Sequence, residues 1–372
     1  MKENKILFIA NKAPQYRIPL FNELAKRLNI KFVFTHEDKK IKELKADYEL
    51  VKGVGYKKYK IHFSLINILR KEKPSKVVML PPDPLQLIDN IFVSEYLKKK
   101  KIPFFIVVGR WKYKEKPLKQ KITELFHKKI LKNAECCLAY GSKSKDWLLE
   151  QGVKEKNIEI IYNINPHIYE NFDEKKKKLL EFKNTKVILY VGRLLKIKGV
   201  DYLIKAFSEL KDKSVVLVLV GGGDFYNLGA KSEEKELKDL IKKLRIEKRV
   251  VFTGHLLPEK TKKYYKSADI FICPSITYKQ GEAWGHVVEE AMSFGLPVIA
   301  TDAVGAAYDL IENGKNGFIV PEKNINALRN AIEKILRSKK LKDNLGKESK
   351  KIIKSKRFSF KNILEKWRVC LK

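Results

Sequence analysis

The sequence predicts an α/β fold with two doubly wound domains, and three observations support this prediction. Short apolar runs of strand length alternate with helix-like stretches along the whole 372-residue chain. Such alternation favours parallel strands covered by helices on both faces of a sheet. The alternation pauses near residues 163–178, which are rich in Asn, Pro and charge, and then restarts. The length also suffices for two domains with buried cores.

Six strands are expected in the first half of the chain, each an apolar run of four or five residues. A helix is expected at Ile18–Leu28, because Leu20, Phe21 and Leu24 recur on one stripe, and another at Pro84–Lys98. The expected strands are Ile6–Ala10, Phe32–Thr35, Val77–Leu80, Phe104–Val108, Cys136–Tyr140 and Glu159–Tyr162.

The second half repeats the pattern, with five strands and four helices before a helical, strongly basic stretch of about forty residues. The expected strands are Lys186–Val191, Val215–Val220, Val250–Thr253, Ile270–Cys273 and Pro297–Ala300. The expected helices are Gly199–Leu210, Glu234–Leu244, Pro258–Ala268 and His286–Phe294.

The composition excludes several classes of protein. With 44% apolar residues the chain is neither disordered nor fibrous. No uncharged apolar run reaches the roughly 18 residues of a spanning helix, and the short run at Ile6–Ala10 does not predict a signal peptide. The four cysteines, two adjacent and two standing alone, lack C-x-x-C spacing, so a reduced, cytoplasmic compartment is expected.

The formal net charge of +35 raises the question of an acidic partner. The excess of Lys and Arg is split almost equally between the two halves, which favours a global effect such as solubility over one nucleic-acid groove. No helix-turn-helix, zinc or RNP signature is present, so nucleic acid is not the expected partner. A basic nucleic-acid-binding protein remains the alternative from a different functional class.

One segment, 98–132, concentrates the charge, with thirteen basic and two acidic residues. Its lysines alternate with apolar and aromatic side chains, a mixture that suits docking on an anionic membrane surface. A Lys-rich solvated face explains the same pattern equally well. The interleaved residues are Trp111, Tyr113, Leu118, Ile122, Leu125 and Phe126.

Two cations follow the first strand of the second half. Arg193 comes directly after Val191-Gly192, and Lys198 lies just before the next expected helix. The junction between strand and helix is where open α/β sheets bind ligands, and Arg and Lys there suit a diphosphate. Two solvated side chains in a Lys-rich chain are the alternative explanation.

The run Gly221–Gly223 also follows an expected strand. A dinucleotide-binding fingerprint requires G-x-G-x-x-G, but the third glycine position is occupied by Tyr226. We therefore expect a tight turn rather than a dinucleotide site.

The segment Gly281–Ala291 carries the strongest signal for a ligand site. Glu282 lies in a loop after a strand, and Glu290 lies one turn inside the following helix. Two acids so placed can contact separate hydroxyl-bearing parts of one ligand, while the free N–H groups at Gly285–Val287 suit phosphate. Glu289 is expected on another face of the helix, solvated or paired.

In order and spacing, these segments resemble the donor domain of the family-4 retaining glycosyltransferases. The resemblance covers about residues 186–335 and rests on Arg193, Lys198, the Glu282–Glu290 segment, GLPVIAT at 295–301 and NGKNGFIV at 313–320. It implies a GT-B fold, in which two Rossmann-like domains face each other across a cleft that holds the active site.

The resemblance also implies roles for individual residues. Gly192, Arg193 and Lys198 would bind the donor diphosphate, and Glu282 would contact the transferred sugar. Glu290 would bind the ribose. Backbone amides at Gly285, His286 and Val287 would contact sugar or phosphate. The residues taken as catalytic are Arg193, Lys198 and Glu282.

The implied domains are an acceptor-binding domain at 1–168 and a donor-binding domain at 169–355. A C-terminal helix at 356–372 would return to the first domain. In the first half, Gln15–Phe21 resembles a segment found in a subset of the family. Relatives often place a His after a mid-domain strand, but here Gly109, Arg110 and Trp111 follow it. Arg17 and Arg110 are the acceptor-side candidates.

The chain contains no Asp-x-Asp motif, so the charge of a leaving diphosphate is expected to fall on protein cations rather than a metal. The expected function is metal-independent, retaining transfer from a UDP- or GDP-linked sugar to a glycan or lipid-linked acceptor, with no bound cofactor. Its expected location is the cytoplasm, with the inner face of the cell membrane as an added docking surface. A nucleotide-sugar epimerase of GT-B fold is the enzymatic alternative.

Overall fold

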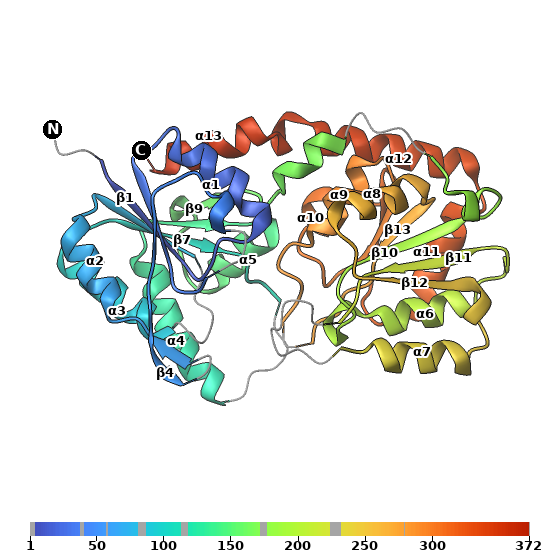
Figure 1. Ribbon diagram of the computed structural model, residues 1–372, viewed down its shortest axis with the longest axis horizontal. Helices are drawn as coiled ribbons and strands as arrows, with labels where there is room; N and C mark the ends of the chain where they lie inside the picture. The colour runs from blue at the N-terminus through green and yellow to red at the C-terminus, as the bar shows by residue number, and fades with distance from the viewer. Residues whose placement is uncertain are drawn as a thin grey trace. The chain divides into compact units, whose positions relative to one another are not determined.

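The computed structural model describes residues 4–37, 41–56, 59–80, 87–112, 118–171, 177–223, 232–278 and 280–371. The chain divides into two compact units. The first contains residues 1–110, 115–166 and 357–372, and the second contains residues 111–114 and 167–356. Each unit is one parallel sheet flanked by helices (Figure 1). Expectations for Pro84, Tyr226 and the side chains of residues 113–123 fall outside the described part.

The first unit is built on a seven-stranded parallel sheet with the order β3-β2-β1-β6-β7-β8-β9. A separate antiparallel hairpin, β4-β5, lies at Val54–Tyr56 and Tyr59–Ile61. The strands of the sheet are β1 (Ile6–Ala10), β2 (Ile30–Phe34), β3 (Tyr48–Leu50), β6 (Lys76–Met79), β7 (Phe104–Val108), β8 (Cys136–Ala139) and β9 (Ile158–Ile160).

Among the described residues, six α-helices belong to this unit, and the last of them is formed by residues 360–371. α13 packs beside α1, and Trp367 of α13 lies 6.0 Å from Phe8 of β1, measured between ring centroids. The helices are α1 (Ile18–Ala25), α2 (Ser64–Glu72), α3 (Leu87–Lys99), α4 (Leu118–Asn133), α5 (Ser142–Glu150) and α13 (Phe360–Leu371).

The second unit is built on a six-stranded parallel sheet with the order β12-β11-β10-β13-β14-β15. Renumbered from its first strand, this is the order 3-2-1-4-5-6 of dinucleotide-binding folds, and the first sheet begins in the same way. Its strands are β10 (Val187–Val191), β11 (Val216–Val220), β12 (Val250–Gly254), β13 (Ile270–Cys273), β14 (Val298–Thr301) and β15 (Gly317–Val320).

In the part of the second unit that the structure describes, seven α-helices accompany the sheet. The core between sheet and helices includes Tyr190, Phe207 and Ile272, all almost fully buried. Among the described residues, no helix is both long and apolar enough to cross a bilayer. The helices are α6 (Val200–Ser208), α7 (Glu234–Lys243), α8 (Pro258–Ser267), α9 (His286–Ser293), α10 (Ala307–Leu310), α11 (Ile325–Leu336) and α12 (Lys339–Lys354).

The predicted α/β class and the eleven predicted strands are confirmed, with boundaries that differ by one or two residues. Two short edge strands, β3 and β15, were not predicted. β15 begins at Gly317, inside a segment whose Asn and Gly residues indicated only a turn. β9 ends at Ile160 rather than Tyr162, because residues 161–164 leave the sheet and line a pocket.

Candidate functional site

The site of the second unit lies where the strand order of its sheet reverses. β10 and β13 are neighbours there, although they are far apart in sequence. Their connections leave in opposite directions, which opens a crevice at the carboxyl ends of the two strands. Arg193 follows β10, and Ser275 and Glu282 follow β13.

Lys198 and Glu282 form an ion pair in this crevice. Lys198 Nζ contacts Glu282 Oε1, and the Ser275 hydroxyl donates a hydrogen bond to Oε2 of the same carboxylate. The two charged side chains are only 17% and 14% exposed. Burial raises the pKa of Glu282, but the charge and hydrogen bond of Lys198, together with Ser275, outweigh burial. The pKa therefore lies below its ordinary value, and the carboxylate is ionised.

The thiol of Cys273 lies beside this carboxylate, with Sγ 4.0 Å from Glu282 Oε2. Burial, reinforced by the charge of Glu282, raises the thiol pKa to about 12. Because the thiolate is the nucleophilic form, Cys273 is an inert neighbour rather than a reactive group.

Hydrogen bonds hold the backbone of Glu282 in place. Its N–H donates to the Ala303 carbonyl at 2.8 Å, and its carbonyl accepts from Gly305 N at 2.9 Å. The indole Nε1 of Trp111 donates to the same carbonyl at 2.8 Å. Gly281 N donates to the carbonyl of Lys112 at 2.8 Å, so residues 111–112 brace the loop that carries Glu282.

The N-terminus of α9 supplies backbone donors next to this carboxylate. Its N-cap, Gly285, has a φ of 100°, and no side chain caps the helix. A Cβ at this position would lie 3.1 Å from Val304 Cγ1 and 3.6 Å from the Glu282 carboxyl carbon. Glycine therefore leaves room for an anion to approach the backbone N–H groups of the first turn.

Arg193 is a half-buried cation at the same end of the sheet. Its carbonyl accepts a hydrogen bond of 2.7 Å from the Tyr190 hydroxyl, which fixes the backbone. Among the described residues, no acidic side chain pairs with its guanidinium. Within the described ranges, Arg193 thus offers a positive charge without an acidic partner, and the α9 N-terminus offers backbone N–H groups; a diphosphate requires both.

The glycines after β11 have a structural role in this region. Gly221 has a φ of 140°, and a Cβ there would lie 1.9 Å from the carbonyl oxygen of Gly192. The two turns therefore touch through their backbones, and Gly222 O accepts a hydrogen bond from Leu194 N at 2.8 Å. Close backbone approach explains these glycines without a dinucleotide.

The two glutamates of α9 differ in their surroundings. Glu290 accepts a 2.9 Å hydrogen bond from the Tyr265 hydroxyl, whose pKa is raised by burial and by the charge of Glu290. Glu289 is fully buried, with bonds of 2.8 Å from Trp284 Nε1 and 3.0 Å to His286 Nδ1. Of the two expectations for Glu289, paired is right and solvated is wrong, because the indole and imidazole replace water around the carboxylate.

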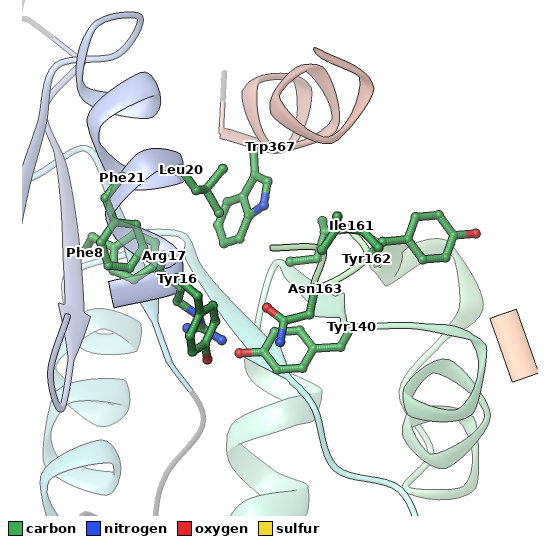
Figure 2. Close-up of a pocket in the computed structure, with 11 residues that line it drawn as sticks. Phe8, Tyr16, Arg17, Leu20, Phe21, Tyr140, Ile161, Tyr162, Asn163 and Trp367 are labelled. Atoms are coloured by element: carbon green, nitrogen blue, oxygen red, sulfur yellow. The ribbon is translucent and has the colours of Figure 1, made fainter. Parts of the chain in front are cut away.

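Arg17 and Arg110, the expected acceptor-side cations, line two different pockets of the first unit. Arg17 is buried in a pocket with Tyr16, Tyr140 and Trp367 (Figure 2). Arg110 Nη1 donates to His127 Nδ1 at 3.0 Å, beside an apolar pocket of about 320 Å³. The structure does not bring the two arginines into one pocket.

Ser275, Trp111 and Tyr265 contact the predicted site residues but were not identified from the sequence. Ser275 lies two residues after the end of β13. Its position at the carboxyl end of a central strand could have identified it from the sequence as a site residue. Trp111 carries no such signal, because it reaches Glu282 across 171 residues of sequence. Within the described ranges, no group of three His, Cys, Asp or Glu residues is arranged to hold a metal ion.

Comparison with known proteins identifies sequence relatives of this chain. Residues 171–352 match the family model described as Glycosyl transferases group 1. An uncharacterised glycosyltransferase of Methanocaldococcus jannaschii is 31% identical over 217 residues, 56% of this chain and 52% of that protein. The capsular polysaccharide biosynthesis glycosyltransferase CapM of Staphylococcus aureus is 31% identical over 186 residues, 50% of this chain and 45% of CapM. The chain thus spans about half the length of these curated relatives.

A solved structure is similar over nearly the whole chain. The crystal structure of Anabaena HepE in complex with UDP covers 99% of both chains, with a TM-score of 0.79 at 19% identity. At this identity the similarity establishes the fold. The two Rossmann-like units are therefore those of the GT-B fold.

Proposed function

We propose that this chain, whose residues 171–352 match the group 1 glycosyl transferases, is a retaining, metal-independent glycosyltransferase. It would transfer a sugar from a nucleotide-sugar donor to a glycan or lipid-linked acceptor. The observation that carries the proposal is that Arg193, which has no acidic partner among the described residues, lies at the same edge of the sheet as the α9 N-terminus and the Lys198–Glu282 pair.

Breaking the bond between the sugar C1 and the diphosphate oxygen leaves negative charge on the diphosphate. Arg193, Lys198 and the amides of His286 and Val287 would stabilise that charge from fixed positions in a partly dry crevice. The acceptor hydroxyl would attack C1 from the side of the departing group, and its proton would pass to a donor phosphate oxygen. Bonds and charges then balance without a nucleophile from the protein.

The two glutamates would bind the donor rather than react with it. Glu282, ionised and held by Lys198, would accept hydrogen bonds from hydroxyls of the transferred sugar. Glu290, positioned by Tyr265, would accept from the ribose. Gly192 and Gly285 would allow the diphosphate to approach the backbone. The UDP held by HepE favours a UDP-linked donor, with GDP as the alternative.

The division of labour between domains belongs to the same proposal. Residues 169–355 would bind the donor, residues 1–168 would bind the acceptor, and 356–372 would complete the first domain. Arg17 and Arg110 would act on the acceptor side. The role of CapM in capsular polysaccharide biosynthesis supports a glycan acceptor. The enzyme would work in the cytoplasm and dock on the inner face of the cell membrane.

The test compares three variants in a transfer assay with UDP- and GDP-sugars. Arg193→Ala and Lys198→Ala should each lower the transfer rate by a factor of about 10²–10³. A loss of this size is expected when a hydrogen-bond donor that stabilises the charge developing in the transition state is removed. Lys196→Ala is the matched control, because its side chain is 46% exposed and pairs with Asp201 and Glu233. Near-normal turnover in both site variants would refute the leaving-group role, and inhibition by EDTA would refute metal independence.

Two alternative functions give different products or ligands. An epimerase would convert a nucleotide sugar without any acceptor, so analysis of the products separates it from a transferase. A nucleic-acid-binding protein would bind duplex with a strong dependence on salt and would not be protected by UDP.

A further inference from the structure

A pocket in the first unit is lined by two hydrogen-bond donors that have no acceptor in the described part of the chain. It encloses about 360 Å³, including space open to solvent, and lies at the carboxyl ends of β8 and β9. Ligands of parallel α/β sheets bind at this edge. The lining residues used below are Arg17, Tyr16, Tyr140, Asn163 and Trp367 (Figure 2).

Arg17 is a buried cation that has no carboxylate partner among the described residues. Only 8% of the residue is exposed, at the end of the 3₁₀ turn that precedes α1. Its guanidinium carbon lies 5.5 Å from the ring centroid of Tyr16 and 5.2 Å from that of Tyr140. In the described part of the chain, no carboxylate or carbonyl accepts a hydrogen bond from the guanidinium. Aromatic faces attract the charge but leave its five N–H donors unused.

The indole N–H of Trp367 is the second donor in this pocket that has no acceptor among the described residues. The residue is 3% exposed, and its indole Nε1 is buried with no hydrogen-bond acceptor within the described ranges. Buried indole N–H groups normally donate a hydrogen bond, because a buried N–H group without an acceptor costs free energy. Figure 2 shows this nitrogen on the side of the ring that faces Ile161.

The Arg17 guanidinium and the Trp367 indole come from opposite ends of the chain, and both can only donate hydrogen bonds. A neutral ligand would leave the charge of Arg17 uncompensated, whereas an oxyanion would accept from the guanidinium and neutralise it. The neighbouring Tyr140 is 7% exposed and can direct its hydroxyl to the same group.

We infer that this pocket binds the carboxylate or phosphate group of an acidic acceptor. The acceptor assignment rests on the proposed function, because the donor-binding groups belong to the second unit. The anion-binding assignment depends only on the first unit.

Binding is tested on the full chain with inorganic phosphate, glucuronate and glucose. The two anions should shift the indole Nε1–H resonance of Trp367 in NMR spectra, assigned with Trp367→Phe, and glucose should not. A Trp367 resonance that ignores both anions, or that moves equally with glucose, would overturn the inference.

Two variants separate ligand binding from a structural role. Arg17→Met should weaken glucuronate binding by at least about tenfold, as expected for loss of a charge-assisted bond. Without ligand it should melt at the same or a higher temperature, because it removes a buried unpaired charge. A lower melting temperature with unchanged glucuronate affinity would show that Arg17 is structural.

Trp367→Phe keeps an aromatic ring and removes the donor, so glucuronate binding should weaken severalfold. Trp147→Phe is the matched control, because Trp147 is equally buried in the first unit but lines the other pocket. It should leave glucuronate affinity unchanged. Equal weakening by both substitutions would overturn the role of Trp367.

The proposed function is tested separately with UDP. An Arg17→Met variant that keeps thermal protection by UDP but loses the glucuronate response supports the inference. If UDP fails to protect the wild type while glucuronate still binds through Arg17, the donor proposal fails and the anion pocket stands.

Discussion

The charged state of Glu282 depends on the Lys198 ammonium that contacts it. The pKa of Glu282 is held below its ordinary value of 4.5 despite burial, because Lys198 and Ser275 contact the carboxylate. A carboxyl group whose pKa is lower in the folded than in the unfolded protein stabilises the folded state at pH values above the unfolded pKa. This stabilisation is lost as the pH falls through the folded pKa. The pair therefore stabilises the second unit at neutral pH and not in acid.

Lys198→Ala should reverse this pH dependence. Glu282 would remain buried without a cation, so its pKa should rise above 4.5 and ionisation should become unfavourable. The loss in free energy of unfolding should be small at pH 4 and reach about 3 kcal/mol at pH 7. Chemical denaturation at both pH values measures the difference, with Lys196→Ala as the exposed control. A loss that is independent of pH would contradict the proposed coupling.

Trp111 contacts Glu282 through the backbone carbonyl of that residue. Trp111→Phe keeps an aromatic ring against Tyr308 but removes the 2.8 Å hydrogen bond. The stability cost should be about 1 kcal/mol, because Gly305 N still bonds the carbonyl. The transfer rate should fall by about tenfold or more, since small displacements of binding groups are costly.

UDP affinity separates positioning from unfolding in this experiment. It should change little in Trp111→Phe, because Arg193 and the α9 N-terminus are untouched. Trp147→Phe makes the same chemical change in the first unit and should leave the transfer rate unaltered. A parallel loss of UDP affinity in Trp111→Phe would contradict a role limited to the Glu282 loop.

The residues of the candidate site differ in how much the sequence could predict. Arg193, Lys198 and Glu282 follow strands, so the fold class alone brings them to one edge of a sheet. The ion pair between Lys198 and Glu282 was not predicted, since it depends on loop paths. Helical periodicity placed Glu289 on a separate face but carried no information about the indole of Trp284 that covers it.

Among the helices, α13 shows how sequence far from a sheet completes its core. Lys366 Nζ bonds the Ile160 carbonyl at 2.8 Å, and Lys76 Nζ bonds the Leu371 carbonyl at 3.1 Å. Cys370 hydrogen-bonds Cys136 of β8, and this bond together with burial raises the pKa of Cys136. Sequence periodicity identified the helix but not these partners.

Phe358 anchors the start of this C-terminal segment. It is 1% exposed and lies edge-on to Tyr162, with ring centroids 5.1 Å apart. Phe358→Ala should cost about 3–5 kcal/mol, because it leaves a cavity in the first unit. Val369→Ala, in the same segment but 62% exposed, should change stability by less than about 0.5 kcal/mol. Denaturation monitored by tryptophan fluorescence compares them, and similar losses would contradict the anchoring role.

Over the whole molecule, a net charge of +35 predicts adsorption to any anionic surface, whether or not a specific docking site exists. Exposed apolar side chains on α3 and α4 supply a more specific signal. Phe92, Leu125 and Phe126 are 53%, 67% and 45% exposed, and lysines such as Lys128 and Lys129 flank the pair on α4. That combination is typical of helices that insert into a membrane interface.

Liposome co-sedimentation distinguishes insertion from general attraction. The double variant Leu125→Gln, Phe126→Gln keeps every lysine, yet it should lower binding to anionic vesicles by about tenfold or more. Phe63→Gln, at another exposed phenylalanine of the first unit, should bind as the wild type does. If the double variant also binds like the wild type, the attraction is only electrostatic.

The path of the chain makes the second unit an insertion. Residues 1–110 and 357–372 belong to the first unit, so both ends of the polypeptide are tied into one folded body, while 167–356 leave it and come back. The first sheet therefore cannot receive α13 until residues 167–356 have been synthesised. A chain truncated after residue 356 would keep the whole of the second unit but leave α1 without the helix that packs beside it.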